Sequence, residues 1–354
     1  MVPEPRRVNH AMVRWALLVA ASVLLAAGFE FVGLSAGLLL GPMVAAIVFA
    51  LRGAALSVPT RLFQAAQALI GILIARSLTP DIAATVIADW PIFLGCTAAT
   101  LLASAGLGYL LSRWQVLPDT TAIWGSMPGA ASAMTLMADG FGADARLVAF
   151  MTYTRVVCVA GVASVLAAVL TGHASSNVVG DLFAPVPWGV AAISIGVAIV
   201  GGVGGVALGL PAGALVGTLV LGAALNLAGV VTVALPGWML MIGYALVGWR
   251  IGLGFTVETV RVARKALPRV LLAVFALLGF AFGIAVLLTR LIDVDLLTAY
   301  LAVSPGGMDS VAVIAASVPV DTPFVMALQL LRFVAVLIAG PTIARAAARR
   351  FAKR

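Results

Sequence analysis

Two stretches of the chain place helix-breaking residues beside polar side chains. Residues 124–132 read Trp-Gly-Ser-Met-Pro-Gly-Ala-Ala-Ser, and residues 304–310 read Ser-Pro-Gly-Gly-Met-Asp-Ser. Because proline removes a backbone donor and glycine weakens a helix, each stretch is predicted to break the apolar helix around it. A break leaves backbone N–H and C=O groups that require protein, water or ligand partners. The candidate substrate- or ion-binding residues at the two breaks are Ser126, Pro128, Gly129, Ser132, Pro305, Gly306, Gly307, Asp309 and Ser310.

Charged residues deep in apolar segments add to this candidate site. Arg155 and Arg332 each lie well inside an apolar segment, and Gln329 lies one helical turn before Arg332. A buried guanidinium needs a partner, which could be an anionic substrate, the carbonyl groups at a broken helix, or Asp309. Two structural alternatives remain open: a salt bridge between Asp309 and an arginine that only holds the fold together, and two kinked helices that pack through glycine.

The residue types that most enzymes and metal sites require are scarce. Cys96 and Cys158 lie in apolar segments, and the two histidines, His10 and His173, are far apart in the sequence. The sequence contains no phosphate-binding loop and no nucleophile elbow, and it offers no His, Cys or carboxylate cluster with metal-ligand spacing. We therefore expect no metal, no cofactor and no enzymatic activity.

Composition indicates that lipid surrounds most of the chain. Of its 354 residues, 63% are hydrophobic and 10% are charged, and the mean hydropathy is +1.18. Such a chain is too apolar to cover a soluble domain with polar surface. Apolar runs of the length needed to cross a bilayer recur along the sequence, which predicts an all-α polytopic membrane protein with membrane lipid as a partner.

The net charge of +8 comes largely from arginines and lysines that flank the apolar runs. The main groups lie within residues 6–14, 52–61, 261–269 and 345–354. Nucleic-acid binding would require basic residues gathered on one folded polar face, so it is not expected. The pattern instead indicates membrane topology.

The chain matches itself at a constant offset of 177 residues. Matches between scarce residue types carry the signal, because alanine and leucine would match by chance in so apolar a chain. They pair Pro91 with Pro268, Thr121 with Thr298, Pro128 with Pro305, Asp144 with Asp321 and Arg155 with Arg332. We predict two membrane repeats, residues 1–177 and 178–354.

Each repeat reads as six apolar segments, of which the fifth is the broken one. If that segment enters and leaves by the same face, the basic loops and both termini lie in the cytoplasm, as the positive-inside bias requires. The basic stretch 257–269 is expected to be one of these loops, with the next segment beginning at residue 268. Five spans per repeat is an odd number, so the repeats are predicted to be inverted and the two breaks to meet near the middle of the bilayer.

Three stretches resemble the internally duplicated AbrB-type membrane proteins of bacteria: Pro305-Gly-Gly-Met-Asp-Ser310, Pro128-Gly-Ala-Ala-Ser132 and Gly248-Trp-Arg-Ile-Gly-Leu-Gly-Phe-Thr256. The resemblance covers nearly the whole chain in motif order and repeat length. It implies a place in the bacterial inner membrane and carries two family labels, regulator of gene expression and ammonia monooxygenase. The second label conflicts with the scarcity of histidine ligands, and the resemblance supplies no established substrate.

The combined prediction is a secondary transporter of an unidentified small solute, linked to gene regulation indirectly through a metabolite pool. The alternatives are a membrane sensor without transport and a membrane enzyme. A signalling protein usually needs a soluble surface to meet a partner, so the short loops between the apolar segments favour transport. The sequence leaves open the coupling ion, the direction of transport and the oligomeric state, including a homo-oligomer.

Overall fold

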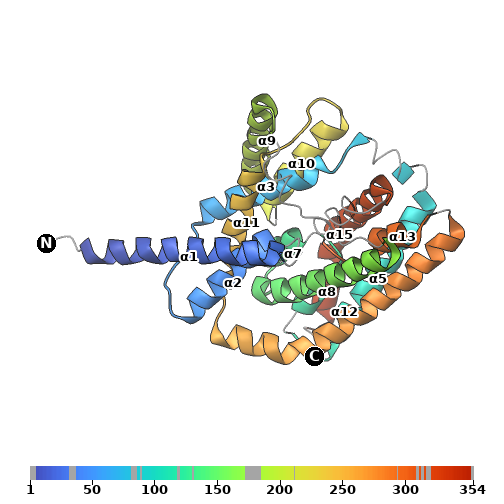
Figure 1. Ribbon diagram of the computed structural model, residues 1–354, viewed down its shortest axis with the longest axis horizontal. Helices are drawn as coiled ribbons and strands as arrows, with labels where there is room; N and C mark the ends of the chain where they lie inside the picture. Colours follow the sequence, from blue (N-terminus) through green and yellow to red (C-terminus); the bar gives the residue numbers. More distant parts are fainter. Residues whose placement is uncertain are drawn as a thin grey trace.

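The computed structural model describes residues 5–31, 37–80, 86–87, 90–117, 120–129, 131–171, 185–210, 212–292, 294–307, 311, 315 and 320–351. Within these residues the chain is all-helical and contains no strand. Figure 1 shows the arrangement of the helices. They are α1 (Pro5–Phe31), α2 (Gly37–Leu51), α3 (Thr60–Arg76), α5 (Trp90–Arg113), α6 (Thr121–Ser126), α7 (Ala131–Gly140), α8 (Ala145–Thr171), α9 (Trp188–Ala207), α10 (Gly213–Leu227), α11 (Gly237–Gly252), α12 (Val257–Leu291), α13 (Leu296–Val303) and α15 (Thr322–Phe351).

Six of the described helices, α1, α5, α8, α9, α12 and α15, are long and apolar enough to cross a membrane. The helices α2 and α10 are also apolar but have only 15 residues each. Large apolar side chains point away from the protein on the outer helices, for example Leu24 on α1 and Val203 on α9, which are 74% and 66% exposed. Such surfaces require lipid around them. The chain is a multi-pass membrane protein.

The predicted helix breaks are both present. Helix α6 ends at Ser126, and Met127 then takes an extended conformation with ψ 129°. Helix α13 ends at Val303, and Ser304 is extended in the same way with ψ 135°. In each case the proline follows the extended residue, where it cannot continue the ladder of backbone hydrogen bonds. The two breaks thus arise from the same local chemistry.

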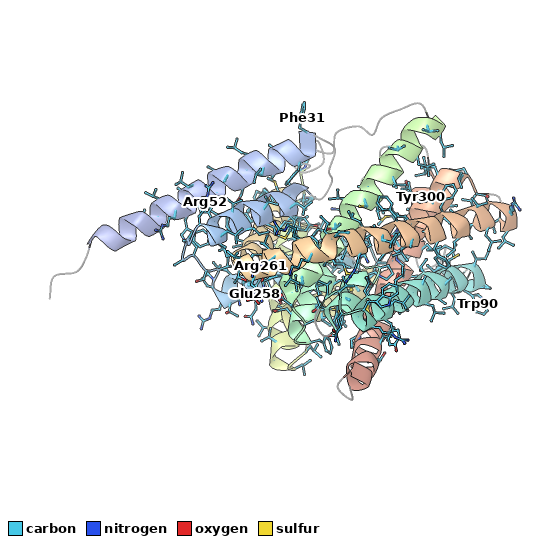
Figure 2. The ribbon with its side chains drawn as sticks, turned by 90° about the horizontal axis from the view of Figure 1, so that it is seen from below. Phe31, Arg52, Trp90, Glu258, Arg261 and Tyr300 are labelled. Carbon is cyan, nitrogen blue, oxygen red and sulfur yellow. The ribbon has the colours of Figure 1, made fainter. Side chains whose placement is uncertain are left out.

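The prediction of a basic loop at 257–269 is wrong, because helix α12 begins at Val257 and includes this stretch. Thr256 caps the helix, its Oγ1 accepting a hydrogen bond from the Thr259 amide at 3.2 Å. Figure 2 shows Glu258 and Arg261 on the first turns of α12. Pro268 lies inside the helix. Its missing N–H leaves only the carbonyl of the exposed Arg264 without a helical partner, and water can hydrate that group.

The helices α1, α2, α3, α9, α10 and α11 form a first helix group that packs through glycine. In this group α2 contacts α1 and α11, and α10 contacts α9 and α3. A Cβ on Gly205 would lie 2.0 Å from the Gly213 carbonyl oxygen, and a Cβ on Gly252 would lie 2.4 Å from the Met43 carbonyl oxygen. Only glycine permits backbones to approach this closely.

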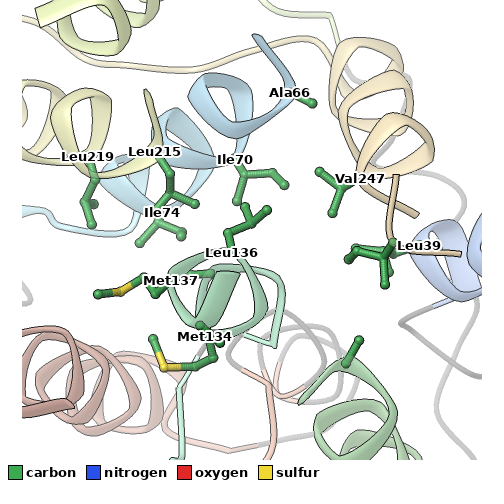
Figure 3. Packing of buried hydrophobic residues seen from close by; sticks show 14 of the residues in the cluster. Leu39, Ala66, Ile70, Ile74, Met134, Leu136, Met137, Leu215, Leu219 and Val247 are labelled. Carbon is green, nitrogen blue, oxygen red and sulfur yellow. The ribbon is translucent and has the colours of Figure 1, made fainter. Parts of the chain in front are cut away.

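A second helix group comprises α5, α8, α12, α13 and α15. The short helix α6 packs on α5 and α8 of this group, and α7 packs on α8 and also contacts α3 of the first group. Helix α12 lies beside α5 and α8, while α15 contacts α5 and α13. Figure 3 shows Leu136 and Met137 of α7 facing Ile70 and Ile74 of α3 in a buried apolar cluster. The region of the first break is therefore packed mainly on α5 and α8 of the second group and meets the first group through the apolar cluster between α7 and α3.

Candidate functional site

Arg332 on α15 connects the two breaks. Its Nη1 donates to the carbonyl oxygens of Ser304, at 2.8 Å, and Val303, at 3.3 Å. Its Nε donates across to the Pro128 carbonyl oxygen at 3.2 Å, and its Nη2 donates to Gln329 Oε1. The side chain is 1% exposed. Of the partners that the sequence left open for this arginine, the structure shows carbonyl groups from both broken segments.

Gln329 completes the arrangement at the second break. It lies one turn before Arg332 on α15 and is 1% exposed. Its Nε2 donates to the Leu301 carbonyl oxygen at 2.7 Å and to the Ser304 carbonyl oxygen at 3.2 Å. The last carbonyls of a helix have no partner within the helix. Gln329 and Arg332 together therefore satisfy the end of α13 where the helix stops inside the protein.

Arg155 on α8 approaches the first break in a similar way but leaves part of its guanidinium unused. Its Nη1 donates to the carbonyl oxygens of Ser126, at 2.9 Å, and Gly125, at 3.3 Å. Its Nε and Nη2 are buried and have no hydrogen-bond partner among the described residues. A small cavity with room for about one water molecule lies against Arg155, Gly125 and Ser126. Leu107 and Leu277 are among the apolar side chains that line its other sides.

The difference between the two arginines follows from the residue one turn before each. At the offset of 177 residues, Thr152 stands where Gln329 stands in the second half. Thr152 is 0% exposed, and its Oγ1 has no partner among the described residues. A threonine is too short to supply the amide oxygen that Gln329 offers to Arg332. The guanidinium of Arg332 at the second break is thus fully paired within the protein, whereas that of Arg155 at the first break is not.

The broken segments also pack against the last helix of the opposite half. A Cβ on Gly340 of α15 would lie 3.2 Å from Met127 Sδ and 3.5 Å from Trp124 Cζ3. A Cβ on Gly306 would lie 2.9 Å from Val159 Cγ1 on α8. Each break is therefore enclosed by helices from both halves of the chain.

The remaining predicted site residues fall into two sets. Pro305, Gly306 and Gly307 are buried beside the second break and Gly129 beside the first. The Ser126 hydroxyl donates to the Ala122 carbonyl oxygen within α6 at 2.7 Å, so the structure shows it as part of the helix end. Asp309, Ser310 and the side chain of Ser132 lie outside the described residues, and the predicted pairing of Asp309 with an arginine stays a prediction.

The sequence indicated the carbonyl groups of a broken helix as possible partners but did not identify the residues that supply them, which include Gly125, Leu301, Val303 and Ser304 before the prolines. A signal for them was present, because the final carbonyls of any helix lack helical partners. A helix that ends inside a membrane must therefore offer acceptors at the residues before the break. The prolines and glycines cause the break, but the preceding carbonyls receive the buried donors.

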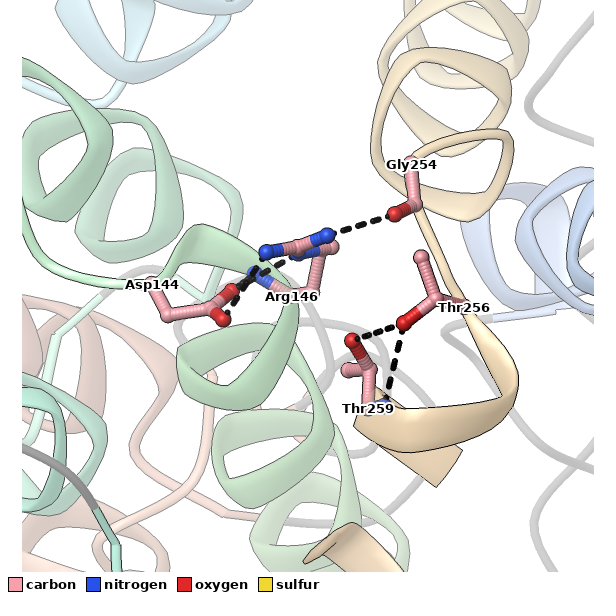
Figure 4. A network of polar contacts seen from close by, with 5 residues as sticks. All are labelled: Asp144, Arg146, Gly254, Thr256 and Thr259. Atoms are coloured by element: carbon pink, nitrogen blue, oxygen red, sulfur yellow. Dashed lines mark hydrogen bonds and ion pairs between the residues drawn. The ribbon is translucent and has the colours of Figure 1, made fainter. Parts of the chain in front are cut away.

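The matched aspartates of the two halves cap helices. Asp144 accepts from the Arg146 amide at 3.0 Å at the start of α8, and Asp321 accepts from the Phe324 amide at 3.0 Å at the start of α15. Figure 4 shows that Arg146 also donates to the Gly254 carbonyl oxygen, at 2.7 Å. This contact borders a cavity of about 400 Å³ between α3, α7 and the end of α11. Among the described residues no three His, Cys, Asp or Glu residues gather as a metal site.

Comparison with known proteins places the chain in a family. The family model described as "Transition state regulatory protein AbrB" matches residues 38–348. The Escherichia coli (strain K12) protein named "Putative regulator AbrB" is 44% identical over 336 residues, which cover 94% of this chain and 96% of that protein. No solved structure matches the chain. The chain belongs to the AbrB family of membrane proteins.

Proposed function

We propose that this protein is a secondary transporter of a small solute in the bacterial cytoplasmic membrane, with its binding site at the two helix breaks. The proposal rests mainly on the position of Arg332, a buried cation that donates hydrogen bonds to carbonyl oxygens of both broken segments. Non-helical backbone inside a bilayer occurs only where protein buries it or where it lines a cavity, and in secondary transporters such breaks form the binding site. Two breaks joined by one charged side chain give a site that can reorganise when either segment moves.

The helix contacts support an internal duplication. The contact of α2 with α11 has its counterpart, at the offset of 177 residues, in the contact of α10 with α3. The contact of α15 with α5 has its counterpart in that of α8 with α12. Equivalent helices thus exchange partners between the halves, as expected for two copies related by a two-fold axis.

The path of the first broken segment supports a re-entrant, inverted arrangement. Trp124 on α6 stacks on Phe141, which follows α7, with ring centroids 5.3 Å apart. This contact supports a chain that returns after the break to the side from which it came. Ten crossings with both termini in the cytoplasm fit this path.

The division into two helix groups supports alternating access. The first group is packed backbone to backbone through glycine, which makes it rigid. The cavity of about 400 Å³ lies where residues of the first group, such as Arg250, meet residues of α7, such as Asp139. Movement of the second group against the first would change access to the breaks from that side.

A membrane sensor without transport is the second candidate, and the name of the E. coli relative, a regulator, favours it. A transporter reaches the same outcome when it changes the pool of a metabolite that controls transcription. The two candidates differ in whether solute crosses the bilayer. They share the requirement for a ligand at the breaks.

Reconstituted liposomes test the proposal. Liposomes with the wild-type protein or without protein are exposed to an isotope-labelled bacterial metabolite extract, with and without a proton or sodium gradient. We expect the wild type alone to accumulate at least one solute. Absence of uptake under every gradient, together with ligand-induced stabilisation of the purified protein, would reject transport in favour of the sensor.

A further inference from the structure

We propose that the ligand at the breaks is a small monocarboxylate anion, bound by the unused edge of the Arg155 guanidinium. The location of this site rests on the proposed function, and the monocarboxylate specifies the class of its substrate. The Nε and Nη2 atoms of Arg155, which lack partners among the described residues, lie on one edge of the guanidinium plane. That edge matches the two oxygens of a carboxylate in a bidentate pair.

The comparison with Arg332 shows that this unused edge is specific to one half. Arg332 uses Nε, Nη1 and Nη2, each with a partner shown by the structure. Both arginines are buried, and unpaired donors of a buried guanidinium are costly. Arg332, with all three nitrogens paired, needs no further acceptor. Arg155, with two nitrogens unsatisfied beside a cavity, requires a further acceptor.

The charge balance gives the sign and the size of the ligand charge. Arg155 and Arg332 lie near each other, since they donate to the carbonyl oxygens of Ser126 and Pro128, two residues apart at the first break. In the sequence, the broken segments 120–138 and 296–316 and the following segments 145–170 and 323–344 contain one carboxylate, Asp309. If Asp309 neutralises one arginine, one positive charge remains in the apolar interior. A monovalent anion neutralises it, whereas a divalent anion would leave an excess of negative charge.

The surroundings of Arg155 favour an organic anion over a strongly hydrated one. Besides the arginine, the cavity is lined by Leu107 of α5, Met151 of α8 and Leu277 of α12. A short alkyl chain gains by contact with these side chains, but sulfate or phosphate would lose its hydration shell there. The cavity holds about one water in this conformation, so the ligand is small and its entry requires α5 or α12 to shift.

The substitution Thr152→Gln tests this assignment directly. It places an amide one turn before Arg155, as Gln329 stands before Arg332, so that the amide oxygen can accept from Arg155 Nη2. We expect the substitution to raise the melting temperature of the ligand-free protein and to weaken carboxylate binding by roughly tenfold or more. The matched control, Thr152→Val, keeps the side-chain volume and supplies no acceptor, and it should bind as the wild type does.

Binding is measured as the melting-temperature shift of the detergent-purified full-length protein. The probes are propionate and butyrate, with propionamide as a neutral analogue and sulfate at equal ionic strength. We expect stabilisation by the monocarboxylates only. Equal stabilisation by propionamide or sulfate, or no stabilisation by any monocarboxylate, would overturn the proposal. If Thr152→Gln fails to fold, Arg155→Lys decides: its ammonium lacks the two-nitrogen edge, and unchanged carboxylate binding would reject the site.

Two results separate the anion site from the transport activity. Liposome uptake of a neutral solute that carboxylates do not inhibit would keep the transporter and reject the anion site. Selective carboxylate binding that Thr152→Gln weakens, without uptake in liposomes, would keep the anion site and reject transport.

Discussion

Arg332 Nε lies 3.2 Å from the carbonyl oxygen of Pro128, so a side chain from the second half of the chain holds the broken helix of the first. The two residues are 204 positions apart in the sequence. This contact makes the two breaks one structural unit. A movement of one break therefore changes the hydrogen bonds of the other.

Replacing Arg332 with glutamine should destabilise the protein strongly. The substitution leaves the carbonyls of Pro128, Val303 and Ser304 without their donor inside the protein. Orphaned buried groups of this kind cost roughly 3 kcal/mol or more in total. Thermal unfolding in detergent measures the loss. Arg76→Gln, at an exposed arginine, is the control and should unfold near the wild-type temperature.

Replacing Gln329 with threonine makes the second half like the first and should also destabilise it. Threonine cannot reach the Leu301 carbonyl or supply the acceptor for Arg332 Nη2. We expect a loss of about 1–3 kcal/mol in unfolding free energy. Denaturant unfolding in mild detergent measures it. A stability equal to that of the wild type would show that neither hydrogen bond matters.

The close helix contact in the first group predicts a sharp contrast between neighbouring glycines. Gly205→Ala would place a Cβ 2.0 Å from the Gly213 carbonyl oxygen, whereas Gly204→Ala meets nothing within 4 Å. Overpacking of this kind costs roughly 1–3 kcal/mol. We expect Gly205→Ala to lower the melting temperature and Gly204→Ala to leave it unchanged or raise it. Equal behaviour of the two variants would contradict the backbone contact between α9 and α10.

Asp309→Asn should remove transport while leaving the protein folded and inserted. The prediction comes from the sequence, in which this carboxylate stands at the second break where the first has Ser132. A carboxylate that exchanges a proton or ion is needed for transport and not for folding. A structural bridge predicts the reverse: loss of stability in Asp309→Asn, and a double variant Asp309→Asn with Arg332→Gln that is no less stable than Arg332→Gln alone, because the bridge is already lost. Melting temperature and liposome uptake of the three variants separate the two roles.

The topology is tested at the start of α12. A cysteine introduced at Glu258, in a chain whose Cys96 and Cys158 are replaced by alanine, should react with a membrane-impermeant maleimide only from the cytoplasmic side. The reason is the positive-inside bias of Arg261, Arg264 and their basic neighbours. Labelling from the periplasmic side in intact cells would reject both this topology and the inverted arrangement.

The breaks could be predicted from the sequence because proline and glycine act locally. The partner of each arginine could not, because carbonyls, Asp309 and a ligand all satisfy a buried guanidinium, and tertiary packing decides among them. The start of α12 was misplaced because the basic stretch 257–269 was assigned to a loop between apolar segments. In the structure the hydroxyl of Thr256 caps the helix, which begins at Val257. The matched pair Asp144 and Asp321 was part of the predicted duplication, which stays a prediction, and the structure explains both residues as helix caps.

The 35 residues of α12 make it longer than the bilayer core is thick. At about 1.5 Å per residue the helix measures roughly 52 Å, against about 30 Å of hydrocarbon. Its first turns, which carry Arg261, Arg264 and Lys265, must therefore extend into the headgroup region or beyond it. Phosphate headgroups attract such residues by about 1 kcal/mol each. The depth and tilt of α12, and with them the wall beside Arg155, thus depend on how much anionic lipid the membrane contains.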